Sequence, residues 1–252
     1  MSLEIAHGEA ILPSLGKIYS SPGLKDKKYI EVRAMRVKEL DIFNSPAYLR
    51  QGTVIDKIIE SCLIDKTIPV SELIASDKDA IMLSIRVLTY GKNYTQEDIK
   101  CPDCENKEKE YKFDLSQTDI KTLDIEPSEP GVNEFDFLLP VAQKNIKFKL
   151  LTADAERDLA KMMESRERKG LEPADVSLRM KTQIIQVDGA RDQAHISKFI
   201  DEDMHPADIL ELQEYIFSIT PSIAWELPFV CPKCKSRNNV PVVIVRSFFR
   251  HK

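Results

Sequence analysis

Two pairs of cysteines are the residues of this 252-residue chain whose types and spacing could do chemistry. Cys101 and Cys104 bracket one Cys-Pro-x-Cys segment, the first hook, and Cys231 and Cys234 bracket another, the second hook. Two thiolates separated by two residues supply half of a structural zinc site, because such a site takes four ligands in a tetrahedron. The two hooks together therefore predict one structural Zn²⁺ site with these four cysteines as its ligands.

The separation of the hooks is the unusual feature of this motif. Zinc ribbons commonly place their hooks about 15–20 residues apart. Here Cys231 follows Cys101 by 130 positions (231 − 101). That separation fits a chain whose two halves fold side by side, so that the metal joins the end of one half to the end of the other. A cross-link that closes so long a loop restricts the unfolded chain strongly.

Other interpretations of the hooks are open at the level of sequence. A thioredoxin-like redox pair has a helix after its cysteines, whereas an alternating strand pattern follows each hook here. Each hook could instead be a half-site completed by another chain, or could bind no metal. The fifth cysteine, Cys62, lies on the apolar side of a helical pattern, and we expect it to be buried as a small hydrophobe.

Catalytic motifs are absent from the sequence. It contains no Gly-rich phosphate loop, no HExxH and no nucleophile elbow. The four histidines are scattered without metal-ligand spacing, and the acidic run Asp201-Glu202-Asp203 is typical of a turn before a helix. We therefore expect a protein that is not an enzyme, with no catalytic residue and no cofactor besides structural zinc.

Charge and hydropathy exclude further classes of protein. The net charge is −5, with acidic and basic residues interspersed, whereas a dedicated nucleic-acid binder usually has a basic surplus. No segment approaches the ~20 apolar residues of a membrane helix, and residues 1–20 lack a basic start followed by an apolar stretch. We expect no nucleic-acid partner, no membrane, and a reducing cytoplasm, where paired cysteines more often bind metal than form disulfides.

The apolar pattern predicts one order of elements for the first half of the chain. These elements are a hairpin at 9–19 and 28–37, helices that begin at Pro46, Ser71 and Asp77, the first hook, and a strand at 110–115. The helix from Pro46 carries its apolar residues as far as Cys62. The helix from Asp77 should end before Gly91, because glycine suits a helix C-terminus.

The second half repeats this order. Its elements are a hairpin at 135–139 and 145–151, helices that begin at Thr152, Ser177, Ile196 and Pro206, the second hook, and a strand at 240–245. Leu12-Pro13 matches Leu139-Pro140 with an offset of 127 (140 − 13), close to the offset of 130 between the hooks. Two landmarks with nearly equal offsets favour an internal duplication, with chance recurrence of a Leu-Pro dipeptide as the alternative.

We therefore interpret the chain as an α+β protein of two pseudo-repeated halves, each with a β-hairpin, helices, a CxxC hook and a strand. The halves are residues 1–125 and 134–252, and a Pro- and Glu-rich linker at 126–133 connects them. A zinc-ribbon-like site of four cysteines would join the two halves.

Several segments resemble the baseplate hub proteins of T4-type tailed bacteriophages. They are Ile68-Pro69-Val70-Ser71-Glu72-Leu73, Ser76-Asp77-Lys78-Asp79-Ala80, Tyr90-Gly91-Lys92-Asn93-Tyr94, and the stretch from the second hook to Ser247-Phe248-Phe249. The resemblance spans most of the chain in order. It implies a hub assembly or structural protein that binds other baseplate hub and tail proteins. Its location would be the infected-host cytoplasm during assembly and, if it stays afterwards, the virion tail baseplate.

The resemblance also suggests where partners would bind. The hairpin ends and Phe248-Phe249 are natural docking surfaces, although a buried end that closes the core is an equal alternative for the two phenylalanines. An alternative from a different functional class is a cytoplasmic zinc-ribbon protein that binds nucleic acid or has a regulatory role. The hooks would give it basic residues opposed by acidic ones, namely Lys233, Lys235 and Arg237 against Asp103, Glu105 and Glu108. A thiol oxidoreductase is a third option.

Overall fold

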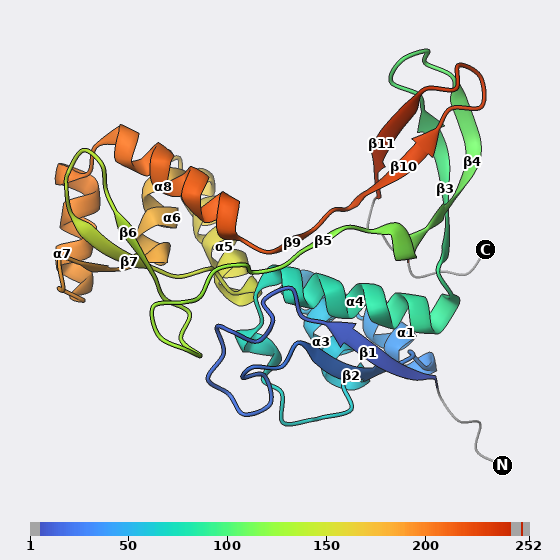
Figure 1. Ribbon diagram of the computed structural model, residues 1–252, viewed down its shortest axis with the longest axis horizontal. Coiled ribbons are helices and arrows are strands. Elements are labelled where there is room, and N and C mark those ends of the chain that lie inside the picture. Colours follow the sequence, from blue (N-terminus) through green and yellow to red (C-terminus); the bar gives the residue numbers. More distant parts are fainter. Residues whose placement is uncertain (1–5, 243–247, 249–252) are drawn as a thin grey trace.

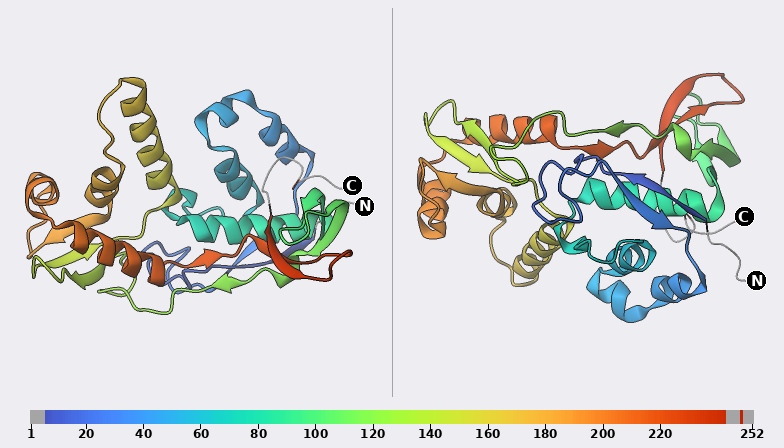
Figure 2. Two further views of the ribbon diagram at one scale, coloured as in Figure 1. Left: turned by 90° about the horizontal axis from the view of Figure 1, so that it is seen from above. Right: turned by 60° about the horizontal axis from the view of Figure 1, so that its bottom comes forward.

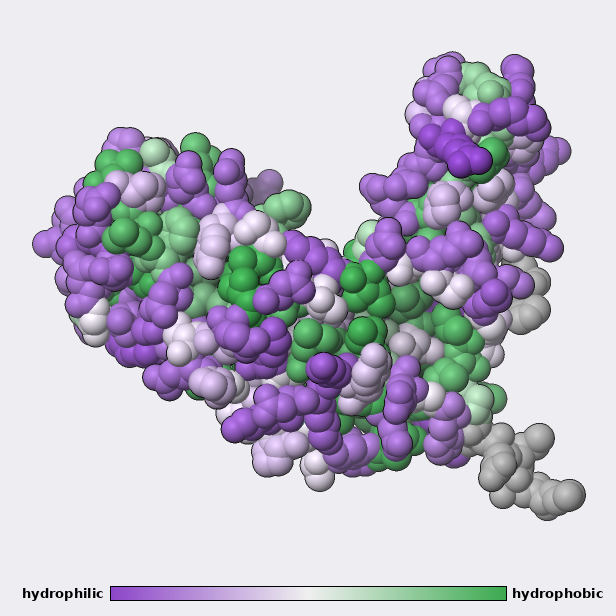
Figure 3. All heavy atoms as spheres, in the orientation of Figure 1, coloured by the Kyte–Doolittle hydropathy of each residue, from purple (hydrophilic) through white to green (hydrophobic). Residues whose placement is uncertain are grey.

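The computed structural model describes residues 6–242 and residue 248, and it divides into two helical bodies and a projecting arm (Figure 1). Residues 7–90 form most of one body and residues 135–219 most of the other, and hairpins at 93–114 and 226–241 form the arm. Helices and short sheets are both present, which confirms the α+β class. A recess separates the arm from the body of the second half, and much of the arm's visible surface is hydrophilic (Figure 3).

The first body forms around a long helix that lies on an antiparallel pair of strands. The pair is β1 (His7–Ile11) and β2 (Tyr29–Arg33). The helices are α1 (Val37–Asn44), α2 (Pro46–Gln51), α3 (Val54–Cys62) and α4 (Ala75–Tyr90), with a 3₁₀ turn at Val70–Glu72. Helix α4 ends at Gly91, whose φ of 80° is readily adopted by a residue without a side chain, and β3 (Asn93–Lys100) and β4 (Lys107–Asp114) follow.

The second body combines a three-stranded antiparallel sheet with four helices. The strands are β6 (Phe135–Leu138), β7 (Asn145–Phe148) and β8 (Ile184–Val187). The helices are α5 (Ala153–Arg168), α6 (Asp175–Gln183), α7 (Gln193–Lys198), which continues into a π-helical turn at Phe199–Asp203, and α8 (Pro206–Ile219). The chain then enters the arm through β10 (Glu226–Val230) and β11 (Arg237–Pro241).

Between the two bodies, a segment of the first half pairs with a segment of the second half. The short strands β5 (Ile120–Lys121) and β9 (Ser222–Ile223) pair there, and Figure 2 shows α8, β9 and β10 following one another along one side of the molecule. An ion network lies close by: the Lys78 ammonium, almost fully buried on α4, is 2.6 Å from Asp56 of α3 and 3.0 Å from Asp154 of α5. This network connects the first half to the first turn of α5 in the second.

Several predicted elements differ from those observed. The single helix expected from Pro46 to Cys62 is wrong, because Gly52, with a φ of 68°, ends α2 and a new helix begins at Val54. The helix expected from Ser177 to residue 187 is also wrong beyond Gln183, where the β-branched Ile184 begins β8. Helix α1 was not predicted.

Asp77 does not cap α4 as expected, since the helix begins two residues earlier. It is instead a buried acceptor for the segment after Leu12-Pro13: the Ser14 backbone N–H donates to Asp77 Oδ1 over 2.9 Å, and the Ser14 and Tyr19 hydroxyls donate to Oδ2 over 2.6 and 2.5 Å. The hairpin of the first body is thereby fixed to the first turn of α4.

The second body contains the matching contact. Immediately after Leu139-Pro140, the backbone N–H groups of Val141 and Ala142 donate to the Asp208 carboxylate over 2.7 and 3.0 Å. Asp208 is fully buried and is the third residue of α8, as Asp77 is the third residue of α4. Both halves therefore tie the residue after Leu-Pro to a buried aspartate in the first turn of their last long helix.

Phe248 closes the base of the arm. Its side chain is fully buried, its ring packs on Tyr94 and Trp225 at centroid distances of 5.2 and 5.9 Å, and its carbonyl accepts from Arg86 Nε over 2.6 Å. Of the two alternatives expected for Phe248, the structure therefore shows a side chain that closes the core, not one that offers a docking surface. Phe249 and residues 243–245 of the expected last strand lie outside the described residues.

Replacement of either buried aspartate by alanine should destabilise the protein. Asp77→Ala leaves three buried donors of Ser14 and Tyr19 without an acceptor, whereas Asp208→Ala leaves the two part-buried backbone N–H groups of Val141 and Ala142 without one. We therefore expect the free energy of unfolding to fall by about 2–4 kcal/mol for Asp77→Ala and by about 1–2 kcal/mol for Asp208→Ala. Asp158→Ala, at a side chain 71% exposed on α5, is the matched control and should change it by less than about 0.5 kcal/mol. Urea denaturation monitored by circular dichroism measures the stability of all three variants. Equal unfolding midpoints for the two buried-aspartate variants and the control would contradict the structural role of these aspartates.

Candidate metal centre

Each hook is the turn of an antiparallel hairpin at the tip of the arm. Cys101–Cys104 connects β3 to β4, with Lys100 paired to Lys107, and the second hook connects β10 to β11, with Val230 paired to Arg237. The turns have the same backbone hydrogen bonds: Cys101 N–H to the Asn106 carbonyl over 2.8 Å, and Cys231 N–H to the Ser236 carbonyl over 3.0 Å. A strand on both sides of each hook is the context of a metal-binding turn, not that of a thioredoxin-like helix.

Positive φ angles close both turns at the same place. Glu105 and Lys235, each one residue past its hook, have φ values of 57° and 63°, and each donates its N–H to the carbonyl of the first cysteine of its hook, over 3.0 and 2.9 Å. Neither is glycine, so each accepts a left-handed conformation that is unfavourable for a residue with a side chain. This geometry turns both cysteines of a hook toward the same side.

The four sulfurs meet between the two hairpins. Sγ of Cys101 is 3.8 Å from Sγ of Cys234, and Sγ of Cys104 is 3.7 Å from Sγ of Cys231. All four atoms lie within 4.8 Å of one another, and none forms a disulfide. Sulfurs about 2.3 Å from a tetrahedral zinc are about 3.8 Å apart. The donor type, number and spacing therefore fit a Zn²⁺ ion held by one chain, without a second chain to complete the site.

Burial and hydrogen bonds shift the pKa values of the hook thiols in different directions. Cys101 and Cys231 are fully buried, whereas Cys104 is half-buried and Cys234 exposed. The Ser236 hydroxyl, 3.6 Å from Cys101 Sγ, lowers the pKa of Cys101 to about 6, and it also lowers the pKa of Cys234. A backbone N–H of Asn106 lowers the pKa of Cys104, but desolvation and the three neighbouring sulfurs outweigh it and raise that pKa to about 12. Four thiolates this close repel one another, so full ionisation needs a positive ion among them.

Contacts between the hairpins hold the hooks face to face. The Asn238 amide of β11 donates to Asp103 of the first hook over 2.9 Å, and the backbone N–H of Val230 donates to the Tyr111 hydroxyl over 3.2 Å. Below the sulfurs, the Tyr111 ring lies 4.8 Å from the rings of both Phe113 and Phe229. These three aromatic side chains form a small core shared by the two halves.

Sequence reasoning found the four sulfurs but missed the residues that support them. Ser236, Asn238 and Tyr111 were not singled out, and neither were the strands that lead into the hooks. The alternation of buried Leu227 and Phe229 in β10 would have been a signal for that strand, but Pro228 between them obscures it.

Other side chains noted in the sequence are packed in the core or stabilise helices, and they lie outside the cysteine cluster. Cys62 is fully buried in α3, and burial raises its thiol pKa to about 11, as expected for a packed hydrophobe. His205 Nδ1 accepts from the Ala207 N–H at the start of α8, and Asp201, Glu202 and Asp203 belong to the π-helical turn. No helix among the described residues is both long enough and apolar enough to cross a bilayer.

Metal content should depend on the four hook cysteines and not on the fifth. We expect elemental analysis to find one zinc per purified chain, and expect Cys101→Ser or Cys231→Ser to reduce that content severalfold because a closed tetrahedral site loses a ligand. Cys62→Ser is the control, since its sulfur lies away from the cluster in α3. Full zinc content in either hook variant would show that the sulfurs do not bind the metal as assigned.

Zinc affinity should fall on acidification. At neutral pH the Cys104 thiol, with a metal-free pKa of about 12, must lose its proton when zinc binds, so the metal competes with protons and binding weakens as pH decreases. Competition with a chromophoric chelator across roughly pH 6 to 8 measures this, with about a tenfold loss of affinity per pH unit for each proton displaced. An affinity independent of pH would contradict thiolate ligation.

Comparison with known proteins identifies a family for the chain. A protein-family model described as T4 bacteriophage base plate protein matches residues 17–250. That range includes all of the second body, the first body except β1, the linker and both hooks, and is nearly the whole chain. Searches of curated proteins and of solved structures found no match.

Proposed function

The chain belongs to the T4 bacteriophage base plate protein family, and on this premise we propose that it is a non-enzymatic hub assembly or structural protein that works through contacts with other baseplate hub and tail proteins. The observation that carries the proposal is the family match over residues 17–250. The site chemistry agrees with it: within the described part of the chain, the hook cysteines are the sole cluster of three or more potential metal ligands, and they form a closed site.

Structural zinc is part of this proposal. Four sulfurs leave no open position for water or substrate on a tetrahedral ion, which is the arrangement of structural rather than catalytic zinc. The ligands come in equal numbers from the two halves, so the ion would hold hairpin β3–β4 against hairpin β10–β11. Its role would be to make the arm one rigid body that can be presented to a partner.

The internal duplication is also proposed, and the aspartate contacts support it. The pairs Ser14–Asp77 and Val141–Asp208 have offsets of 127 (141 − 14) and 131 (208 − 77), which bracket the offset of 130 between the hooks. A chance Leu-Pro dipeptide would not bring with it a buried aspartate at the third position of a helix and the same acceptor role. We retain the division into 1–125, a linker at 126–133 and 134–252, with one hairpin of the arm from each half.

Location follows from the proposed role. A baseplate assembly protein acts in the cytoplasm of the infected host, and one that remains after assembly is part of the virion tail. The nucleic-acid interpretation gains nothing from the structure, because Lys233, Lys235 and Arg237 share the tip of the arm with Asp103 and Glu105, and mixed charge of this kind is not the basic stripe that phosphate binding requires.

Association with other tail proteins tests the function. We expect the tagged chain, co-expressed with the baseplate hub and tail proteins of the same phage, to co-purify with at least one of them. Because the proposed ion makes the arm rigid, Cys101→Ser with Cys231→Ser should reduce recovery severalfold, whereas Cys62→Ser should not. Lack of association with any of these proteins under conditions in which the chain is folded and zinc-loaded would refute the proposal.

A further inference from the structure

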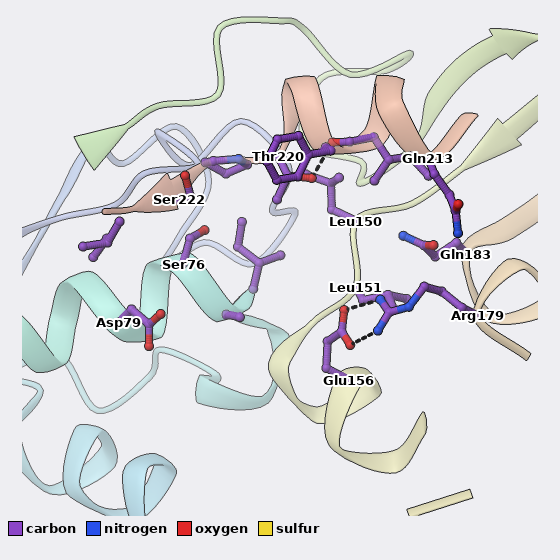
Figure 4. Close-up of a pocket in the computed structure, with 16 residues that line it drawn as sticks. Ser76, Asp79, Leu150, Leu151, Glu156, Arg179, Gln183, Gln213, Thr220 and Ser222 are labelled. Carbon is purple, nitrogen blue, oxygen red and sulfur yellow. Dashed lines mark hydrogen bonds and ion pairs between the residues drawn. The ribbon is translucent and has the colours of Figure 1, made fainter. Parts of the chain in front are cut away.

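A pocket of about 540 Å³ lies between the two bodies, away from the sulfurs. Helix α4 of the first half forms one wall, and α5, α6, α8 and β9 of the second half form the others (Figure 4). Its size is within the range of roughly 300–1,000 Å³ that is usual for ligand sites, and it exceeds what one side chain fills. The walls are largely apolar, with contributions from Leu150, Leu151, Ile216, Pro221 and Ile223.

Two residues of α4 that line this space, Ser76 and Asp79, have side-chain oxygens without adequate partners. Ser76 is 7% exposed, and its Oγ is buried with no hydrogen-bond partner among the described residues. Asp79, one turn further along the same face, accepts only a long hydrogen bond of 3.3 Å from Trp225 Nε1, and no described lysine, arginine or histidine forms an ion pair with it. Burial accordingly raises the pKa of Asp79. A buried hydroxyl without a partner costs free energy, so its position needs an explanation.

The opposite wall is electrostatically neutral. Arg179 of α6 makes a two-pronged ion pair with Glu156 of α5, with N–O distances of 2.8 and 2.9 Å, and this pair lies across the pocket from Asp79 in Figure 4. Three charged side chains therefore line the pocket. Arg179 and Glu156 neutralise each other, whereas Asp79 has no cation paired with it among the described residues. The site has a net negative charge on its α4 side, next to apolar walls.

We propose that this pocket binds a lysine or arginine side chain, together with an adjoining apolar residue, from an extended segment of another tail protein. The cation would donate to the Asp79 carboxylate, and rotation of the Ser76 side chain toward the pocket would let its Oγ accept from the same cation. Its alkyl stem would lie along the apolar wall, as long basic side chains do. The rest of the pocket would hold the neighbouring residue, and Phe217, 82% exposed at the rim, offers an aromatic contact of the kind found at interface hot spots.

The choice of a basic segment rests on charge complementarity, and the choice of a tail protein rests on the proposed function. A chain with a net charge of −5 attracts basic segments from solution before any contact forms. An acidic segment would place like charges together at Asp79, and a wholly apolar one would bury both polar groups without a partner.

A peptide array tests the inference with the full, zinc-loaded chain. The immobilised peptides share Gly-Ser flanks and an apolar–X–apolar centre in which X is lysine, arginine, norleucine, glutamine or glutamate. We expect lysine and arginine to bind about tenfold more tightly than norleucine or glutamine, as one charge-assisted hydrogen bond in a partly buried site allows. Glutamate should bind weakest. Equal binding across the five residues would overturn the proposal.

Variants locate the binding on α4. Asp79→Asn keeps an acceptor for Trp225 and removes the charge, so it should abolish the preference for lysine, whereas Asp158→Asn on exposed α5 makes the same charge change and should retain it. Ser76→Ala should weaken binding severalfold without loss of stability, because the hydroxyl has no partner to lose. An unchanged preference in Asp79→Asn would refute the site.

Trp225 supplies an independent readout. It is the sole tryptophan of the chain, and its indole donates to Asp79, so a soluble lysine peptide without tryptophan should change the protein's fluorescence while the glutamate peptide does not. Co-purification with tail proteins is measured separately. An array without cation preference would reject the pocket and leave the proposed function standing, whereas loss of all association would reject the function itself.

Discussion

The meeting of two sequence-distant hooks is the constraint on which the arm depends. The hairpins β3–β4 and β10–β11 are separate two-stranded sheets, and isolated hairpins are marginally stable in water. Their shared aromatic contacts, from Tyr111 to Phe113 and to Phe229, are each worth about 0.5–1.5 kcal/mol beyond the area they bury. By the chain-entropy relation, a cross-link that closes the 130 positions between Cys101 and Cys231 is worth about 5 kcal/mol. If a metal joins the four sulfurs as proposed, this closure would stabilise the fold more than the aromatic contacts do, and it would explain how so small a core can support a projecting arm.

A buried cation holds the base of the arm together with the aromatic contacts of Phe248. Arg86 of α4 is 2% exposed and donates to three carbonyl oxygens, those of Phe248, Gly91 and Asn93, at 2.6, 2.7 and 3.1 Å. Its guanidinium also lies 5.3 and 5.6 Å from the ring centroids of Tyr90 and Phe248. Desolvation lowers its pKa, yet arginine remains charged. Its planar fork of donors satisfies the carbonyl groups of Gly91 and Asn93, where α4 ends and β3 begins, and also that of Phe248 at the base of the arm.

Local signals in the sequence predicted the parts of this structure that local chemistry determines. Thr152, which accepts from the Ala155 N–H, and Pro206 mark helix starts, Gly91 marks a helix end, and the cysteine spacing gave the four sulfurs. The failures lie where tertiary contacts decide. Residues 184–187 continue a helical apolar pattern, but pairing with β7 makes them a strand. Asp77 has the residue type of a cap, but its acceptor capacity is used by a segment 63 residues away, and no periodicity in one sequence reveals such a partner.

The pocket and the arm are supported by the same face of one helix. Asp79 and Arg86 are seven residues apart on α4, or two turns and about 10.5 Å along its axis, and Trp225 connects their surroundings: its indole N–H donates to Asp79, its ring packs edge-on against Phe248, and its carbonyl accepts from Val242 as the chain leaves β11. A segment seated against Asp79 would therefore lie at a fixed distance and angle from the arm. A helix with both attachment points on one face sets this geometry through its own stiffness, without any moving part. The proposed role of holding tail proteins in a defined relation would need such an arrangement, and residues from both halves of the chain would supply it jointly.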